Sequence, residues 1–331
     1  MNRSSKNLMT LKKAITGFVN HKLAEGLSPR SVASYERLLN KWVDQVGDQD
    51  IADISPQAIR EYLKWLRIEY KPKRLNGKTH PLSAKTIRNI WVTLASFFKW
   101  ACREFNIDSP MQNIPAPKYQ KKPVEAFTKD EVEAVVKACQ YSRKADTAYR
   151  MSFTMRRPTA KRDRAIILVL LDTGLRASEL CALKVENVNL RTGKVEVAHG
   201  AEGGAKGGKG RTVYLGKVAR KAMWRYLVDR DDGEEPYAPV FVTKDDRPMN
   251  PSSLRLLIKR LGKKAGVQNA YPHKFRHTFA ITYLRSGGDV FTLQSLLGHG
   301  SLDMVRHYAQ IAEVDLRDAH RRASPADNWR L

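Results

Sequence analysis

Apolar residues in the first hundred positions recur at helical spacing. Two of the expected helices begin with the same kind of pair, Ser28-Pro29 and Ser55-Pro56. Serine at an N-cap accepts a hydrogen bond from an otherwise unpaired backbone N–H, and proline at the first helical position has no N–H to leave unpaired. The apolar stripes after the two pairs are Val32, Tyr35, Leu39 and Trp42, and Ile59, Tyr62, Leu63 and Leu66. With an opening helix from residue 8 and a further helix over 83–105, the pattern predicts four helices.

A change in composition marks the end of this helical region. Residues 109–123 (SPMQNIPAPKYQKKP) hold four prolines and several lysines without any helical period, which is typical of an extended, positively charged linker. A chain of 331 residues also exceeds the usual size for one hydrophobic core. We therefore predict two domains, at 1–108 and 124–331, joined by this linker.

The second part of the chain mixes helical and strand patterns. A capped helix is expected over 128–139, and a strongly apolar helix over 165–171 breaks at Asp-Thr-Gly. Strand-like runs at 194–198 and 211–215 flank a glycine-rich connection (HGAEGGAKGGKG). The fold class expected is mainly α, α+β, with a small antiparallel sheet. The basic segment 141–164 is interpreted as a surface excursion, and either DNA contact or a plain solvated face fits it.

Charge narrows the possible partners. The chain has 59 Lys and Arg against 34 Asp and Glu, a net charge of +25, and nucleic acid is the first candidate because basic side chains that neutralise phosphates release counterions. An anionic membrane is a weaker candidate, since no segment reaches the roughly 20 apolar residues of a membrane span. The N-terminus also lacks an apolar secretory core, so we expect a cytoplasmic protein without membrane contact. Composition alone would also fit a ribosome-associated protein.

Neither cysteines nor histidines predict a metal site. Cys102, Cys139 and Cys181 are odd in number and widely spaced, which favours reduced thiols over disulfides or zinc ligands. His273 and His277 lie four apart, but Lys274 stands where the zinc-protease motif has glutamate, and Arg276 would repel a cation. The same groups suit an anion, because a guanidinium offers a fork of donors to phosphate oxygens and a neutral imidazole accepts a proton.

The glycine-rich connection superficially matches a nucleotide-binding P-loop. Residues 203–209 fit G-x-x-x-x-G-K, but Gly210 follows where serine or threonine would bind magnesium, and the flanks are both strand-like. We reject the P-loop for this reason. A hairpin tip that bears Lys206 and Lys209 on flexible glycines is better suited to a DNA groove, although such lysines alone would fit a plain exposed loop.

Four dispersed segments fit one pattern. They are residues 173–180 (TGLRASEL), the Lys206 hairpin, His273-x-x-Arg276, and residues 296–299 (LLGH) with Tyr308 nine positions after the histidine. In order and spacing the chain resembles the tyrosine recombinase family, which includes phage integrases and Xer dimer resolvases, over roughly residues 8–313. The resemblance implies a SAM-like four-helix core-binding domain and a catalytic domain of the DNA breaking-rejoining fold. It also implies strand cleavage and rejoining without metal, ATP or any other cofactor.

Carried over by motif, the resemblance assigns roles to the basic residues. Arg176 and Arg276 would clamp the non-bridging oxygens of the scissile phosphate and stabilise the charge of the transition state. Lys206 would be the general acid that protonates the departing 5′-oxygen, with Lys209 as the second choice.

The remaining roles fall on four further residues. Tyr308 would be the nucleophile that forms a 3′-phosphotyrosyl bond, which stores the energy of the broken strand. His273 would be a general base or a phosphate ligand, and His299 would hydrogen-bond the phosphate and help to position Tyr308. Glu179 would orient the basic side chains from behind.

Departures from the family pattern are modest. Val305 stands where the family often has threonine, Gln310 where it often has histidine, and Gly300 where serine is common. None of the three positions holds a catalytic group. The tail, residues 311–331, would form a helix that docks on a neighbouring subunit, or else a frayed terminus.

The resemblance further implies an assembly. The two domains would clamp double-stranded DNA at specific recombination sites, and a homotetramer on two sites would exchange strands through a four-way Holliday junction. The free protein would be a monomer or dimer. Because the expected helices begin near the N-terminus, we expect no additional arm-binding domain. The alternatives are a type IB topoisomerase and a DNA-binding accessory protein without cleavage; integration, excision and dimer resolution all stay open as the biological purpose.

Overall fold

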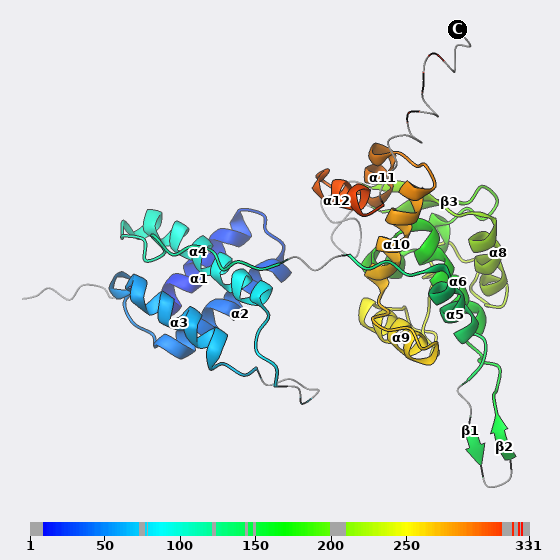
Figure 1. The fold of residues 1–331 in the computed structure, drawn as a ribbon, viewed down its shortest axis with the longest axis horizontal. Helices are drawn as coiled ribbons and strands as arrows, with labels where there is room; N and C mark the ends of the chain where they lie inside the picture. The colour runs from blue at the N-terminus through cyan, green and yellow to red at the C-terminus, as the bar shows by residue number, and fades with distance from the viewer. Residues whose placement is uncertain are drawn as a thin grey trace, which may run out of the picture. The chain divides into compact units, whose positions relative to one another are not determined.

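The chain divides into two compact units, Met1–Lys122 and Pro123–Leu331, which Figure 1 shows as ribbons. This computed structural model describes residues 9–72, 77, 79–120, 124–142, 145–147, 150–198 and 210–312, together with residues 320, 324 and 326. Each of the two units has a hydrophobic core of its own.

Unit 1 is built from helices, as the sequence predicts. They are α1 (Leu11–Ala24), α2 (Pro29–Val46), the 3-10 turn η1 (Ile51–Asp53), α3 (Pro56–Ile68) and α4 (Ala84–Phe105). The side chains of Ser28 and Ser55 accept hydrogen bonds from the backbone N–H groups of Ser31 and Ala58, so the two expected N-caps are confirmed. Thr10 caps α1 in the same way, and it places the start of this helix three residues later than expected.

The core of unit 1 is apolar and rich in aromatic rings. Phe97 on α4 lies edge-on to Phe18 of α1 and to Trp42 of α2, at centroid distances of 5.5 and 6.3 Å. The segment that follows α4 also contacts this core: Ile114 is buried in it, and the Trp91 indole donates a hydrogen bond to the Ile114 carbonyl oxygen. Residues of the expected linker therefore pack against unit 1.

Unit 2 is mainly helical with two small antiparallel sheets, which confirms the expected fold class. Its elements are α5 (Lys129–Ala138), β1 (Ala145–Thr147), β2 (Arg150–Phe153), α6 (Ala160–Thr173), α7 (Ala177–Ala182), η2 (Val185–Asn187), β3 (Lys194–Val197), β4 (Arg211–Tyr214), α8 (Lys217–Leu227), α9 (Pro251–Lys264), α10 (Pro272–Arg285), α11 (Val290–Leu297) and α12 (Asp303–Ala312). Strand β3 pairs with β4, so that Lys194 faces Tyr214 and Val197 faces Arg211.

The segment 141–164 has more structure than its weak periodicity suggested. Strands β1 and β2 form a hairpin that projects from the body of unit 2 in Figure 1. The chain then enters α6 at Ala160, five residues before the expected start of that helix. The expected apolar run is the buried middle of α6, and the polar residues before it form the first turn.

Helix α6 directs the chain into a tight turn. Its residues 165–171 are all apolar, and the helix packs against α8 and α10. It ends at Gly174, whose φ of 62° is left-handed, a conformation that glycine adopts without steric cost. A Cβ at this position would lie 2.5 Å from Phe279 Cδ1 on α10. The turn at Gly174 therefore lets the next residues run along α10 and into α7.

Candidate active site

Arg276 ties together two turns of unit 2 that are distant in sequence. Its side chain is fully buried in the middle of α10, and it donates hydrogen bonds to the carbonyl oxygens of Gly174 and Leu297 at 2.8 and 2.6 Å. Gly174 ends α6, and Leu297 is the last residue of α11. Arg276 thus fixes the turn that carries Arg176 beside the turn that carries His299.

Glu179 holds two arginines at one edge of this site. Its carboxylate accepts hydrogen bonds from Arg176 Nη1 at 2.6 Å and from Arg211 Nη1 and Nη2 at 3.0 and 2.7 Å. Burial would raise the pKa of Glu179, but Arg211 and Arg176 outweigh it and lower that pKa to about 2. Glu179 is therefore charged at neutral pH, and the Arg176 side chain, 24% exposed, is held by a fixed anion.

Arg211 is a member of the site that the sequence analysis missed. It opens β4 at the foot of the glycine-rich connection, and besides binding Glu179 it donates from Nε to the Leu296 carbonyl oxygen at 2.6 Å. The only sequence signal was its place beside that connection. A strand position with a basic residue gives no sign of whether the side chain lies in solvent or, as here, is 8% exposed.

His299 receives a hydrogen bond from the buried arginine. Arg276 Nη2 lies 2.8 Å from His299 Nε2, and because a guanidinium only donates, Nε2 must accept. Burial, followed by the charges of Arg276 and Arg176, lowers the pKa of His299 to about 4. The neutral ring therefore carries its proton on Nδ1. Two buried donors, His299 Nδ1 and Arg276 Nε, have no acceptor among the residues that the structure describes.

Tyr308 lies inside the same cluster. It is fully buried on α12, its ring stacks on that of His299, and its hydroxyl lies 2.7 Å from His277 Nδ1. Burial raises the pKa of Tyr308, against the opposing effect of Arg276 and Arg176. The hydrogen-bond partner of Tyr308 is thus His277, which the sequence analysis weighed only as a zinc ligand.

His273 occupies the outer side of this arrangement. Its ring packs edge-on against that of His277, with 4.4 Å between centroids. His273 is exposed to solvent, whereas His277 is buried, with 8% of its surface exposed. Desolvation of the ring and the charges of Arg276 and Arg176 lower the pKa of His273. The structure therefore brings Arg176, Glu179, His273, Arg276, His299 and Tyr308 together.

The two candidate lysines lie outside the described residues. Lys206 and Lys209 both belong to the stretch 199–209. The strands on either side are described: Val197 of β3 pairs with Arg211 of β4. The connection that carries both lysines therefore begins and ends beside Arg211.

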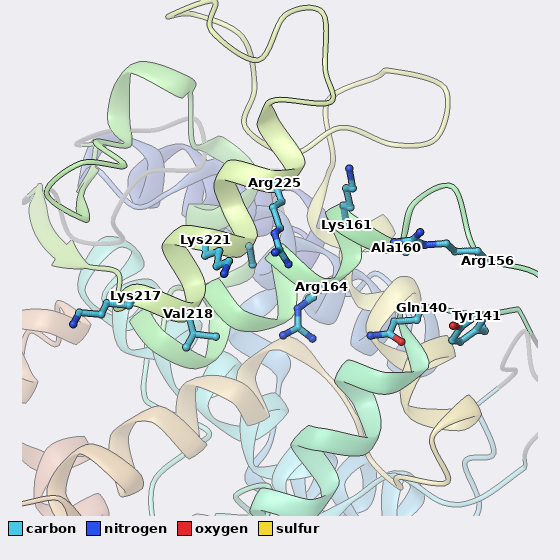
Figure 2. A pocket seen from close by; sticks show the side chains of 11 residues that line it. Gln140, Tyr141, Arg156, Ala160, Lys161, Arg164, Lys217, Val218, Lys221 and Arg225 are labelled. Carbon is cyan, nitrogen blue, oxygen red and sulfur yellow. The ribbon is translucent and has the colours of Figure 1, made fainter.

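A second feature of unit 2 is a basic surface pocket of about 800 Å³. Figure 2 shows it, with cationic side chains from the end of the hairpin segment and from α6 and α8. They are Arg156, Lys161, Arg164, Lys217, Lys221 and Arg225. Lys161 forms an ion pair with Asp229. Two of the cations lie on α6 and three lie on α8. Basic residues of the segment 141–164 therefore line the same pocket as basic residues of α8.

Neither a metal-binding cluster nor a membrane-spanning helix is present in the described part of the chain. In those ranges, no three His, Cys, Asp or Glu side chains gather in a way that would hold a metal ion. None of the helices described is both long and apolar enough to cross a bilayer.

The comparisons with known proteins agree over both units. Residues 125–314 match the model of the phage integrase family, and residues 15–105 match that of the phage integrase N-terminal SAM-like domain. The chain is 31% identical to tyrosine recombinase XerA of Pyrococcus horikoshii over 310 residues, 92% of each chain. It is 29% identical to tyrosine recombinase XerC of Alcanivorax borkumensis over 318 residues, 95% of this chain and 94% of the relative.

Solved structures show the same fold. The Tn1549 transposon integrase in complex with a circular intermediate DNA matches with a TM-score of 0.69 and 19% identity, over 90% of this chain and 94% of that one. A lambda integrase dimer bound to a COC′ core site matches with a TM-score of 0.65 and 19% identity, over 91% and 77% of the two chains.

Proposed function

The chain belongs to the phage integrase family of tyrosine recombinases, and we propose that it cleaves and rejoins DNA at specific sites through Tyr308. The observation that supports this most directly is the single cluster of Arg176, Arg276, His299 and Tyr308, in which Arg276 and Tyr308 are fully buried and the other two are half-buried. Its residues come from two turns, which carry Arg176 and His299, and from two helices, α10 and α12. A hydrogen bond joins Arg276 to His299, and the ring of Tyr308 stacks on that of His299. A cluster with this excess of positive charge favours a phosphate as its substrate.

The proposed binding of the scissile phosphate rests on donors that lack acceptors. Arg176 and Arg276 carry positive charge, and the only anion bonded to either in the described residues is Glu179. Burial and the Arg176 charge lower the pKa of Arg276 to about 9, so it stays charged at neutral pH. Preorganised donors of this kind stabilise the extra charge on phosphoryl oxygens in the transition state. Glu179 keeps Arg176 in place, and exposed His273 serves as a phosphate ligand.

The proposed chemistry is two matched transesterifications. The Tyr308 oxygen attacks phosphorus and forms a 3′-phosphotyrosyl bond, while the bond from phosphorus to the 5′-oxygen breaks. The general acid that protonates this leaving oxygen is Lys206, with Lys209 as the second candidate. Attack by a 5′-hydroxyl on the phosphotyrosyl bond then rejoins a strand. Since bond energy is conserved, the reaction needs neither ATP nor a cofactor.

The proposed assembly is drawn from the family rather than from this chain alone. Relatives have been captured as a dimer on a core site and with a circular intermediate DNA. For this chain we propose a free monomer or dimer and a homotetramer on two double-stranded recombination sites, with exchange through a Holliday junction. Residues 1–108 are assigned as the core-binding domain, 109–123 as the linker and 124–331 as the catalytic domain. Integration, excision and resolution all use this chemistry.

Covalent capture tests the proposal. The protein is incubated in EDTA with a library of genomic DNA fragments and denatured with detergent, and the DNA linked to it is recovered and sequenced. We expect a narrow set of sequences from the wild type and none from Tyr308→Phe, which retains the ring that packs on His299 but has no nucleophilic oxygen. The folded state of the variant is checked by circular dichroism.

Each other outcome has a definite meaning. Capture without sequence preference would replace site-specific recombination by the relaxation chemistry of a type IB topoisomerase. Tight DNA binding without capture by the wild type would contradict the proposal and leave an accessory DNA-binding protein. Capture that persists in Tyr308→Phe would assign the nucleophile to another residue.

A further inference from the structure

The hydroxyl of Tyr308 has one hydrogen-bond partner in the described residues, and this partner is a histidine without a role in the proposed reaction. His277 lies one position after Arg276 on α10, and its Nδ1 is 2.7 Å from Tyr308 Oη. The contact joins residues 31 positions apart, and both side chains are buried. A reacting oxygen that is already bonded to an imidazole suggests that the imidazole takes part in the reaction.

The protonation states fix the direction of this hydrogen bond. Burial, followed by the charges of His273, Arg276 and His307, lowers the pKa of His277 to about 4. Burial also raises the pKa of Tyr308. Both groups are therefore neutral at physiological pH. A phenol is the better donor of the two and an imidazole nitrogen the better acceptor, so Tyr308 donates to Nδ1 and the ring proton of His277 lies on Nε2.

The other two histidines of the site are arranged differently. His299 already accepts a hydrogen bond from Arg276 on Nε2, so this nitrogen has no lone pair left for the tyrosine proton. His273 is exposed and contacts the ring of His277 rather than Tyr308. Of the three imidazoles, His277 alone has a nitrogen bonded to the reacting oxygen in the part of the chain that the structure describes.

We propose that His277 positions the Tyr308 hydroxyl and accepts its proton during strand cleavage, an inference that rests on the proposed function. As the Tyr308 oxygen forms its bond to phosphorus, the hydroxyl proton passes along the existing hydrogen bond to His277 Nδ1. The 5′-oxygen leaves with a proton from the general acid. In the rejoining step a 5′-hydroxyl attacks phosphorus and gives its proton back to the general acid, while the phosphotyrosyl bond breaks and the proton returns from His277 to the Tyr308 oxygen. Protons and charges balance over the two steps.

The surroundings of His277 make this proton transfer depend on the substrate. His273 and Arg276 face it from α10, Tyr308 and His307 from α12, and the Arg176 charge acts on the same cluster. The positive charges of Arg276 and Arg176 disfavour an imidazolium in the DNA-free chain. A phosphodiester bound by Arg176 and Arg276 brings a negative charge that offsets them, and so raises the proton affinity of His277. The base therefore becomes effective when the phosphate is in place.

The first test is the pH profile of single-turnover cleavage, with the DNA sequence that the wild type captures as substrate. His277→Asn places an amide close to Nδ1, which can hold the hydroxyl but cannot take its proton at these pH values. We expect this variant to cleave on the order of 10²- to 10⁴-fold more slowly near neutral pH, the usual contribution of a general base. Its rate should rise about tenfold per pH unit up to about pH 9, because the phenol must then ionise unaided. The wild type should show no such slope.

Two further variants separate a chemical role from a structural one. His277→Ala removes both the acceptor and the packing, and we expect it to cleave no faster than His277→Asn. The matched control is His307→Asn, which changes the half-buried histidine next to Tyr308 on α12 and should keep the flat profile of the wild type. A His277→Asn enzyme with the rate and flat profile of the wild type would overturn the proposal. Cleavage by His277→Ala that is faster than cleavage by the wild type would also overturn it, because the contact would then restrain the nucleophile.

A measurement without DNA completes the design. In protein labelled with ¹³C at the tyrosine ζ carbon, the signal missing from Tyr308→Phe belongs to Tyr308. We expect this signal to move in His277→Ala and to stay in place in His307→Asn; an unchanged signal in His277→Ala would contradict the hydrogen bond. If the wild type captures no DNA, the proposed recombinase function fails. If it captures DNA while the His277 variants cleave normally, only the present inference fails.

Discussion

The cores of the two units differ in what they bury. In unit 1 the largest buried side chains are aromatic and aliphatic, and among the described residues its one buried polar residue is Thr93. The other buried polar residues belong to unit 2, and they are Asp163, Thr173, Glu179, Lys274, Arg276, His277, Thr278 and Ser324. Unit 1 is thus held by packing, whereas unit 2 places charge in its interior.

Interior charge is stabilised in unit 2 by paired groups. Asp163, fully buried at the start of α6, lies between Arg157 and Arg162, with oxygen–nitrogen distances of 2.6 and 2.8 Å. Glu179 lies between Arg176 and Arg211. A buried ion that loses its partner costs several kcal/mol. The stability of unit 2 should therefore depend on partners and pH, and that of unit 1 on the fit of its side chains.

The largest effect expected is that of Phe97→Ala in unit 1. Phe97 is fully buried between Phe18, Trp42 and Phe98, and its truncation leaves a cavity that rigid aromatic neighbours cannot fill. We expect the free energy of unfolding of unit 1 to fall by about 4 kcal/mol. Hydrogen exchange of the α4 amides in the full chain measures this. If the α10 amides lose the same protection, the two units do not unfold separately.

The second prediction is that acid weakens unit 2 and leaves unit 1 nearly unchanged. The folded pKa of His277 and His299 is about 4, below the ordinary 6.5, so the unfolded chain binds protons more readily and stability is lost as pH falls from 6.5 towards 4. Glu179, with a folded pKa of about 2, adds a loss below pH 4.5. We expect the free energy of unfolding of unit 2 to fall by about 3 kcal/mol between about pH 7.5 and about pH 4.5.

The same hydrogen-exchange measurement checks this pH dependence. Among the described residues of unit 1, the group with a shifted pKa in the acid range is Glu25, whose carboxyl binds Lys22 at the surface, so the α4 amides should keep their protection. The contrast is sharpened by His277→Asn, which removes one of the titrating groups and should make the loss in unit 2 shallower. Equal losses of protection in the two units on acidification would contradict the prediction.

The third prediction concerns the arginine that the sequence analysis missed. Arg211→Met removes two hydrogen bonds to Glu179 and one to the Leu296 carbonyl oxygen. Because Glu179 keeps Arg176, we expect a loss of about 2 kcal/mol rather than the full cost of an unpaired buried ion. Urea unfolding of this variant, of Glu179→Gln and of the double variant forms a cycle. A coupling energy near zero would show that Arg211 acts on the α11 turn alone.

Sequence periodicity predicted unit 1 well because its core follows a local rule. Leu39, Trp42, Ile59 and Leu66, taken from the two apolar stripes, are all buried. A stripe on one helix depends on residues three and four positions apart, so a single sequence contains it. The N-caps at Ser28 and Ser55 are local in the same sense.

The unit 2 site was only partly predictable. Motif spacing indicated Arg176, Arg276 and Tyr308, and the structure brings them together. The spacing did not indicate which histidine forms a hydrogen bond with the tyrosine. The pairs His277 with Tyr308 and Arg211 with Glu179 join residues 31 and 32 positions apart. Whether a charged side chain is buried depends on tertiary packing, which no local pattern records. The β1–β2 hairpin was missed because its strands are short and carry no clear alternation.

The smallest effect expected is at the basic pocket of Figure 2, where charge lies on the surface of unit 2 and belongs to neither core. Lys217 and Lys221 are exposed one turn apart on α8. If the pocket contacts the DNA backbone, the double variant Lys217→Ala/Lys221→Ala should bind duplex DNA several-fold more weakly. Its plot of log affinity against log salt should be less steep by about 2, since each phosphate contact contributes about 0.9.

The matched control is Lys129→Ala, at an exposed position on α5. Stability should change by less than about 0.5 kcal/mol in both proteins, because neither replaces a buried group. A salt dependence equal to that of the control would place the pocket away from DNA. A shallower slope would instead make the segment 141–164 and α8 one phosphate-binding surface, so that surface cations of unit 2 add affinity while its buried ones serve the reaction.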